Sequence, residues 1–220
     1  MDVLLPPAAH CPVSGPPTGL SAAHAQVRAA KTDLREAVLR DRALRSEAEQ
    51  QHAARELRDV LLELSAVRGA ARVGVYVSRA GEPDTRPLRR ALVGRGAEVV
   101  VPVIGRSAGL RWLHLGESVV NVAHHGRMPL RQPPAEPGVD VVIVPAYAVD
   151  TDGRRLGRGC GRYDRILRHL DPGVLVFAVV YDDELLDSAV EAVPEEPHDV
   201  RVPAAVTPTR LRIFAADTLV

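Results

Sequence analysis

The sequence predicts an α/β fold with three layers, in which a mostly parallel, twisted sheet of the Rossmann-like kind carries helices on both faces. Several short segments are apolar almost throughout, which is typical of parallel strands buried on both faces. Segments with a helical spacing of apolar residues alternate with these strands along the chain. The chain has 220 residues, of which 46% are hydrophobic and 25% are charged, so it can bury a sizeable core.

The first part of the chain is expected to form a leader followed by helices. Residues 1–20 are rich in proline and glycine and are predicted to be disordered, whereas residues 21–220 are predicted to form a single domain. Apolar residues recur at helical spacing between residues 21 and 67: Val27, Leu34, Val38, Leu39, Leu57, Val60, Leu61 and Leu64. Ser46, with Glu49 three residues later, forms a capping box, which predicts a helix break near residues 45–46.

After residue 69 the pattern changes to strands that alternate with helices. Buried strands are expected at 72–78, 97–104, 139–146 and 173–180. A weaker strand at 109–115 is expected at the sheet edge, and a last strand at 201–209. Helices are expected at 84–96 and 163–170, with a short one at 185–190. Because ligands of such sheets bind at the carboxyl ends of the strands, the loops after Val77, Val144 and Val180 should meet in one cleft.

Charge and composition argue against several classes of function. The formal net charge is zero, so no global field would attract nucleic acid or an anionic membrane, and only 3% of residues are aromatic. No apolar run approaches the roughly 20 residues that span a bilayer, and the N-terminal segment lacks the basic start of a signal peptide. We therefore expect a cytoplasmic monomer without nucleic acid or membrane partners, in which Cys11 and Cys160 are reduced thiols.

The strongest local pattern is DTDGRRLGRGCGRYDR at residues 150–165, between a buried strand and a helix. Its alternating glycines would let backbone N–H groups approach a ligand, and its interleaved arginines would bind phosphate oxygens. The alternative is a flexible connection whose arginines lie in solvent. The spacing matches neither a P-loop nor a dinucleotide-binding fingerprint. Asp164 could hold Mg²⁺ on phosphate oxygens, or it could be an ordinary aspartate favoured by the helix dipole.

This loop resembles a segment of the 5-formyltetrahydrofolate cyclo-ligase family, G-x-R-L-G-x-G-x-G-Y-Y-D, which stands here at residues 153–164. Three further segments match the family in the same order along the chain. They are KTDLR at 31–35, Val77 with Glu82 after the first strand, and His198 with Asp199 before the last strand. The similarity extends from about residue 25 to residue 214, and the shared order makes it more specific than any single motif.

The resemblance implies a ligase that uses ATP and Mg²⁺ to cyclise 5-formyltetrahydrofolate to 5,10-methenyltetrahydrofolate, with release of ADP and phosphate. It implies Lys31 and Arg158 as catalytic residues, and Asp164 and Asp199 as metal ligands. The implied ATP-binding residues are Lys31, Arg35, Arg155, Leu156, Gly157, Arg158, Gly159, Cys160, Gly161, Arg162 and Tyr163. The implied residues for the reduced folate are Val77, Glu82, Arg158 and Arg162.

Other interpretations of single residues stay open. Lys31 and Arg35 lie four residues apart and share a helix face, which could also be a solvated basic edge. Asp199 could form a turn after Pro197, and the adjacent histidines at 124 and 125 are more typical of a solvated loop than of a metal site.

Two departures from the family pattern concern the substrate side. Arg162 replaces the first of two tyrosines, and Gln132 stands about where the family has a glutamate. They leave two alternatives open: an ATP-dependent ligase or kinase of the same fold with a non-folate substrate, and a non-catalytic nucleotide-binding module. Lys31, Arg35 and the two aspartates that match the family argue against the second.

Overall fold

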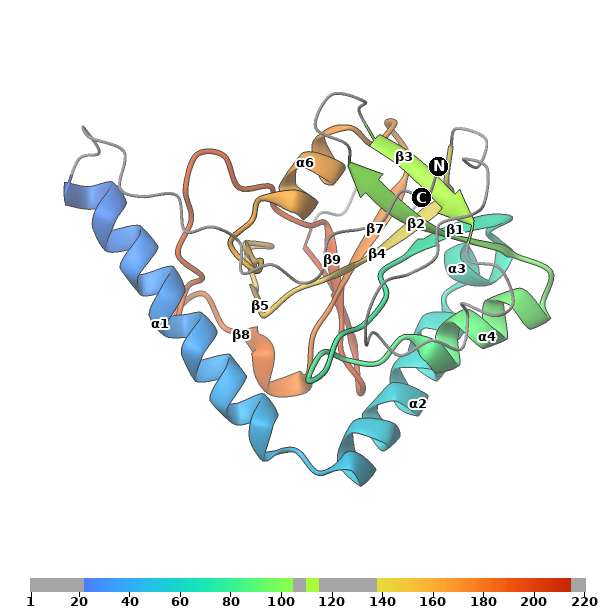
Figure 1. Ribbon diagram of the computed structural model, residues 1–220, viewed down its shortest axis with the longest axis horizontal. Coiled ribbons are helices and arrows are strands. Elements are labelled where there is room, and N and C mark those ends of the chain that lie inside the picture. The colour runs from blue at the N-terminus through green and yellow to red at the C-terminus, as the bar shows by residue number, and fades with distance from the viewer. Residues whose placement is uncertain (1–21, 105–109, 115–137, 215–220) are drawn as a thin grey trace, which may run out of the picture.

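A computed structural model describes residues 22–104, 110–114 and 138–214, and its central feature is a seven-stranded sheet (Figure 1). The strand order is β10-β9-β7-β4-β1-β2-β3. The strands are β1 (Arg72–Val75), β2 (Glu98–Ile104), β3 (Leu110–His114), β4 (Val141–Pro145), β7 (Leu175–Val179), β9 (Ala204–Val206) and β10 (Leu211–Ile213). The five inner strands are parallel, and β3 and β10 pair antiparallel at the two edges. The mostly parallel sheet is confirmed, and so is the weaker strand at its edge.

Side chains alternate along the strands between two apolar cores, one on each face of the sheet. On one face, Val73, Val141 and their equivalents pack with α2 (Glu47–Glu63), α3 (Ser65–Gly69) and α4 (Arg86–Gly94). On the other face, Val142 and Ala178 belong to a core that includes side chains at or just beyond α6 (Arg162–Arg168). Figure 1 shows α6 on the side of the sheet opposite to α2 and α4. The three-layer prediction is therefore confirmed.

The N-terminal helical region is divided where the capping box predicts. Helix α1 spans Ala22–Leu44 and α2 begins at Glu47. The Ser46 side chain accepts a hydrogen bond from the Glu49 backbone, and the Glu49 carboxylate accepts one from the Ser46 backbone at 2.8 Å. Such a cap stabilises a helix by about 1 kcal/mol. The two helices diverge from this corner, so α1 lies apart from the layer that α2 and α4 form (Figure 1).

Helix α1 packs instead on a small second sheet, which the sequence did not predict. This sheet consists of β6 (Arg155–Leu156), β5 (Ala148–Asp150) and β8 (Leu185–Leu186), and a short 3₁₀ helix, η1 (Asp182–Glu184), leads into β8. Leu34 and Val38 of α1 pack with Ala148 and Leu156. The helix predicted at 185–190 is wrong, because Leu185 and Leu186 pair with β5 and the chain then turns.

Some predictions concern residues outside the described ranges. These are the disordered leader at 1–20, Gln132, and the histidines at 124 and 125. Within the described ranges, no helix is both long enough and apolar enough to cross a membrane.

Candidate active site

The glycine loop, residues 157–161, lies between β6 and α6, near the carboxyl end of β4. Gly159 has φ +90°, a backbone conformation that favours glycine strongly over any other residue. Gly157 is needed for a different reason, because a Cβ atom there would lie 2.9 Å from Nη1 of Arg155. The two glycines therefore allow a tight path over a buried arginine, and the loop beyond Gly157 is exposed.

Helix α1 brings Lys31 and Arg35 to this loop, as their shared helix face predicts. The Nε atom of Arg35 donates a hydrogen bond to the carbonyl oxygen of Gly157 at 2.8 Å. One helical turn earlier, Lys31 is only 5% exposed and Nζ lies 2.9 Å from Oε2 of Glu196 and 2.5 Å from Oδ2 of Asp199. Three segments far apart in the chain, 31–35, 157–159 and 196–199, therefore meet at one place. A solvated basic edge does not describe this helix face.

Two carboxylates and an imidazole lie together in the site, those of Glu196, Asp199 and His198. One ligand atom from each of the three lies within 4.8 Å of the other two. The backbone of Glu196 donates to Oδ2 of Asp199 at 2.7 Å, so the turn that Asp199 was expected to form brings the two carboxylates together. Burial alone would raise the pKa of Glu196, but hydrogen bonds from Lys31 and Arg28 lower it overall. The carboxylate is therefore charged near neutral pH, and hard oxygen ligands of this kind suit Mg²⁺.

Asp164 lies beside the same segment but has other partners. Its Oδ1 atom accepts hydrogen bonds from Nη2 of Arg155 at 2.8 Å and from the backbone of Val200 at 3.2 Å. The Arg155 side chain is almost fully buried and also approaches the carbonyl oxygen of Pro145 at 3.4 Å. Arg155 thus links the end of β4 to α6, and Leu156 faces the small core behind it. Neither side chain is presented to the exposed side of the loop.

The predicted folate residues gather on the other side of the loop. Nη1 of Arg158 lies 3.3 Å from Oε1 of Glu82, and the second Glu82 oxygen accepts a hydrogen bond from the Arg79 backbone at 2.9 Å. Tyr163 lies near this carboxylate, and its pKa is raised by burial and by the Glu82 charge. Arg162 is exposed at the first turn of α6, and Val77 packs against the main core.

Arg79 is a functional candidate that sequence reasoning missed. Burial and the like charge of Arg158 lower its pKa, and Arg162 contributes to the same effect. Arg79 therefore lies among the like charges of Arg158 and Arg162 and near Glu82, and such an arrangement suits a ligand with anionic groups. In the sequence, only the position of Arg79 in the loop after the first strand could have indicated a functional role.

Arg42 was also missed, although it lies on the same face of α1 as Lys31 and Arg35. It makes a bidentate ion pair with Glu184 at 2.7 and 2.8 Å and donates to the carbonyl oxygen of Ala146 at 2.8 Å. Its guanidinium also lies 5.0 Å from the ring centre of Tyr147. This buried cluster fixes α1 across the carboxyl ends of β4 and β7.

Cys160 lies in the exposed part of the loop. The expectation of reduced thiols stays a prediction, because Cys11 lies outside the described residues.

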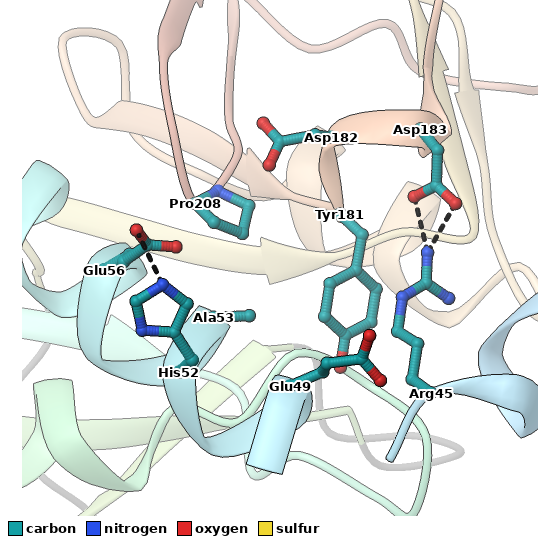
Figure 2. A pocket seen from close by; sticks show the side chains of 9 residues that line it. All are labelled: Arg45, Glu49, His52, Ala53, Glu56, Tyr181, Asp182, Asp183 and Pro208. Atoms are coloured by element: carbon teal, nitrogen blue, oxygen red, sulfur yellow. Dashed lines mark hydrogen bonds and ion pairs between the residues drawn. The ribbon is translucent and has the colours of Figure 1, made fainter. Parts of the chain in front are cut away.

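A separate pocket lies at the corner between α1 and α2 (Figure 2). Its volume is about 260 Å³, and Arg45 pairs with Asp183 on one of its sides while His52 pairs with Glu56 on another. None of the residues predicted to bind ATP, folate or metal lines it. The predicted residues instead converge on the glycine loop, so the pocket is not the predicted site.

Comparison with known proteins gives consistent matches over most of the chain. The protein-family model described as the 5-formyltetrahydrofolate cyclo-ligase family matches residues 27–208. The 5-formyltetrahydrofolate cyclo-ligase of Mycolicibacterium smegmatis is 40% identical over 192 residues, which cover 82% of this chain and 94% of that protein. The enzyme of the same name from Escherichia coli K12 is 34% identical over 149 residues, or 63% of this chain and 79% of that protein.

Solved structures agree with the sequence comparisons. The NMR structure of 5,10-methenyltetrahydrofolate synthetase from Aquifex aeolicus matches with a TM-score of 0.68 and 26% identity, covering 84% of this chain and 92% of that one. A 5,10-methenyltetrahydrofolate synthetase from Mycoplasma pneumoniae matches with a TM-score of 0.63 over 81% of this chain and 98% of that one. The second match, at 19% identity, concerns the fold alone.

Proposed function

Because this chain belongs to the 5-formyltetrahydrofolate cyclo-ligase family, we propose that it uses ATP and Mg²⁺ to convert 5-formyltetrahydrofolate to 5,10-methenyltetrahydrofolate, with release of ADP and phosphate. One observation carries the proposal beyond the family match. Lys31 and Arg35 of α1 meet the glycine loop and the Glu196–Asp199 segment at one place, although both of these segments are more than 120 residues from α1 along the chain. The meeting point combines cations for phosphate with carboxylates for a metal.

The chemistry requires activation of an amide. The formyl oxygen is a poor leaving group, so N10 of the folate cannot displace it directly. Transfer of the γ-phosphoryl group of ATP to this oxygen makes it a good leaving group. N10 then attacks the formyl carbon and loses its proton, and phosphate departs as the methenyl bridge closes. Such a reaction depends on positioning and on neutralising phosphate charge, and it needs no covalent bond to the protein.

The residues around the glycine loop have the charges that this reaction needs. We assign Lys31, Arg35 and Arg158 to the phosphate groups, with the backbone of residues 155–163 along the nucleotide. Each of these three cations has a protein acceptor: a carboxylate pair, a backbone carbonyl and Glu82 respectively. Phosphate would replace these acceptors, so binding would exchange one set of charged hydrogen bonds for another.

The acidic segment fits Mg²⁺ in its donor chemistry. Glu196 and Asp199 supply charged oxygens, and a cation, the Lys31 ammonium, already lies within hydrogen-bond distance of both. We propose Asp199 and Asp164 as metal-binding residues, with Asp164 contributing Oδ2 because Oδ1 is shared by Arg155 and Val200. The metal would offset phosphate charge during transfer.

On the substrate side, we assign Val77, Glu82, Arg158 and Arg162 to the reduced folate. Glu82 is partly buried and can accept hydrogen bonds from the pterin ring, while the arginines around it suit the carboxylates of the glutamate tail. We also propose that the protein is a monomer in the cytoplasm.

The test is formation of the methenyl chromophore. The chain is incubated with 5-formyltetrahydrofolate, ATP and Mg²⁺, and absorbance is followed with each component omitted in turn. We expect product only when all three are present, and much less product with Lys31→Ala. Binding of ATP without any methenyl product would instead favour a ligase or kinase with another substrate, for which Arg162 is the supporting feature.

A further inference from the structure

Lys31 holds an unusual position for a residue assigned to phosphate. It is the only lysine in the chain, and its side chain is 7% exposed. Its ammonium group lies 2.9 Å from Glu196 and 2.5 Å from Asp199, so it occupies the space that a metal ion bound by these two carboxylates would need. The carboxylates of Glu196 and Asp199 are therefore already paired with a cation of the protein itself, the Lys31 ammonium group.

A divalent ion and the Lys31 ammonium cannot both occupy the space between Oε2 of Glu196 and Oδ2 of Asp199. Metal–oxygen distances for Mg²⁺ are about 2.0–2.1 Å, so an ion between the two carboxylates would lie closer to them than Lys31 does. Two cations separated by so little in a partly buried place repel each other strongly. An ion bound through Oε2 of Glu196 and Oδ2 of Asp199 therefore requires Lys31 to leave these oxygens, and Lys31 then needs another anion as its partner.

We propose that Lys31 and a divalent cation alternate on Glu196 and Asp199, and that nucleotide phosphate receives Lys31 when the metal takes its place. The proposal rests on the proposed function, since it uses the ATP phosphates as the second partner of Lys31. It makes Glu196 a metal-binding residue that the family pattern did not indicate. It also makes metal and nucleotide bind cooperatively, because each removes the obstacle to the other.

The surroundings fit an exchange of this kind. Arg28 approaches Glu196 from the solvent side at 3.1 Å through Oε1, whereas Lys31 uses Oε2. Glu196 therefore keeps one cationic partner while Lys31 moves. Arg35 lies one turn further along α1. Within the described residues, its side chain donates a hydrogen bond only to the carbonyl oxygen of Gly157. Lys31 and Arg35 can therefore both turn to phosphate from the same helix face.

The first experiment measures Mn²⁺ binding by electron paramagnetic resonance, on the full chain without added nucleotide. We expect weak binding to the parent and at least tenfold tighter binding to Lys31→Met, in which the carboxylate pair has lost its cation. Arg35→Met is the matched control, since it removes a nearby charge that does not touch the carboxylates, and it should change the affinity much less. Adding Glu196→Gln to Lys31→Met should abolish the gain. If Lys31→Met does not fold, as judged by circular dichroism, Lys31→Gln makes the same comparison.

The second experiment uses the fact that Lys31 carries the only side-chain amine. Its acylation by an N-hydroxysuccinimide ester is followed by mass spectrometry of the peptide that contains it, which separates it from the N-terminal amine. Saturating Mn²⁺ should raise the labelling rate several-fold by displacing the ammonium group. Unchanged labelling, or no gain in Mn²⁺ affinity for Lys31→Met, would overturn the exchange. These results are independent of the methenyl assay: an active parent without exchange refutes only this inference, and an inactive parent with exchange refutes only the proposed function.

Discussion

Replacing Arg42 by methionine should destabilise the fold far more than loss of an exposed arginine. Methionine keeps most of the length of the side chain but removes the charge and the donors. The variant loses a bidentate ion pair to Glu184 and a hydrogen bond to Ala146, all at 2.7–2.8 Å and all buried. It also leaves the Glu184 carboxylate buried, with Arg45 at 4.0 Å as its remaining cation.

The expected loss is about 3–5 kcal/mol at neutral pH, the range found when one partner of a buried ion pair is removed. Most domains are stable by only about 5–15 kcal/mol, so this is a large fraction of the total. Arg201→Met is the matched control. Arg201 pairs with Glu195 at the surface, its side chain is 49% exposed, and its loss should cost about 0–1 kcal/mol. Urea unfolding followed by circular dichroism measures both.

The loss should also depend on pH. Burial raises the pKa of Glu184, although the hydrogen bond from Arg42 opposes this, and without Arg42 the pKa should rise further. Below the unfolded pKa of about 4.3, the carboxyl group is protonated in both states, and the part of the penalty that comes from the unpaired charge is absent. Above it, ionisation favours the unfolded chain, so the difference between the variant and the parent should grow from pH 4 to pH 8. A difference below 1 kcal/mol, or one that is equal at pH 4 and pH 8, would refute this account of the cluster.

Three further predictions concern the site itself. Lys31→Ala and Arg35→Ala should each weaken ATP binding by roughly 1.5–3 kcal/mol, the range for a charge-assisted hydrogen bond, and an unchanged dissociation constant by calorimetry would remove that residue from the assignment. Asp164→Asn and Asp199→Asn should lower activity at ordinary Mg²⁺ concentrations and recover part of it at higher concentrations; parental activity in both would contradict a metal-binding role. Arg162→Tyr should leave the steady-state constants for 5-formyltetrahydrofolate within a few-fold of the parent, whereas a large gain over a nearly inactive parent would show that the chain has moved away from folate.

Much of the fold could be predicted because its signals are local. Apolar runs such as 141–145 have no exposed face, and they became the parallel centre of the sheet. The break at Ser46 depends on one side chain and the turn that follows it, so a four-residue pattern was enough. The small sheet had no comparable signal, since β6 and β8 have two residues each. A strand of two residues has no periodicity, and the pairing of Leu185 with Val149 therefore overrode a helical pattern.

The site was predictable in its outline and not in its contacts. The segments that carry Lys31, the glycine loop and Asp199 were found, because each is a compact motif. The side-chain partners were not, since burial decides them: Arg155 turns inward to Asp164, although the alternating pattern treats it like the exposed Arg158. Glu196 was missed for a related reason, because a second acidic residue near Asp199 has meaning only once Lys31 is known to lie between them.

The attachment of α1 also has a consequence for the order in which the chain folds. The helix is made early in synthesis, yet its charged partners are found near the other end of the chain: Arg42 and Glu184 are 142 residues apart, and Lys31 and Asp199 are 168 apart. Contacts of such sequence separation form late, because a long loop must close first. We expect the parallel sheet to assemble while α1 remains undocked, and α1 to pack onto the small sheet only after residues 184–199 have left the ribosome. The binding site for nucleotide would then be the last part of the molecule to form.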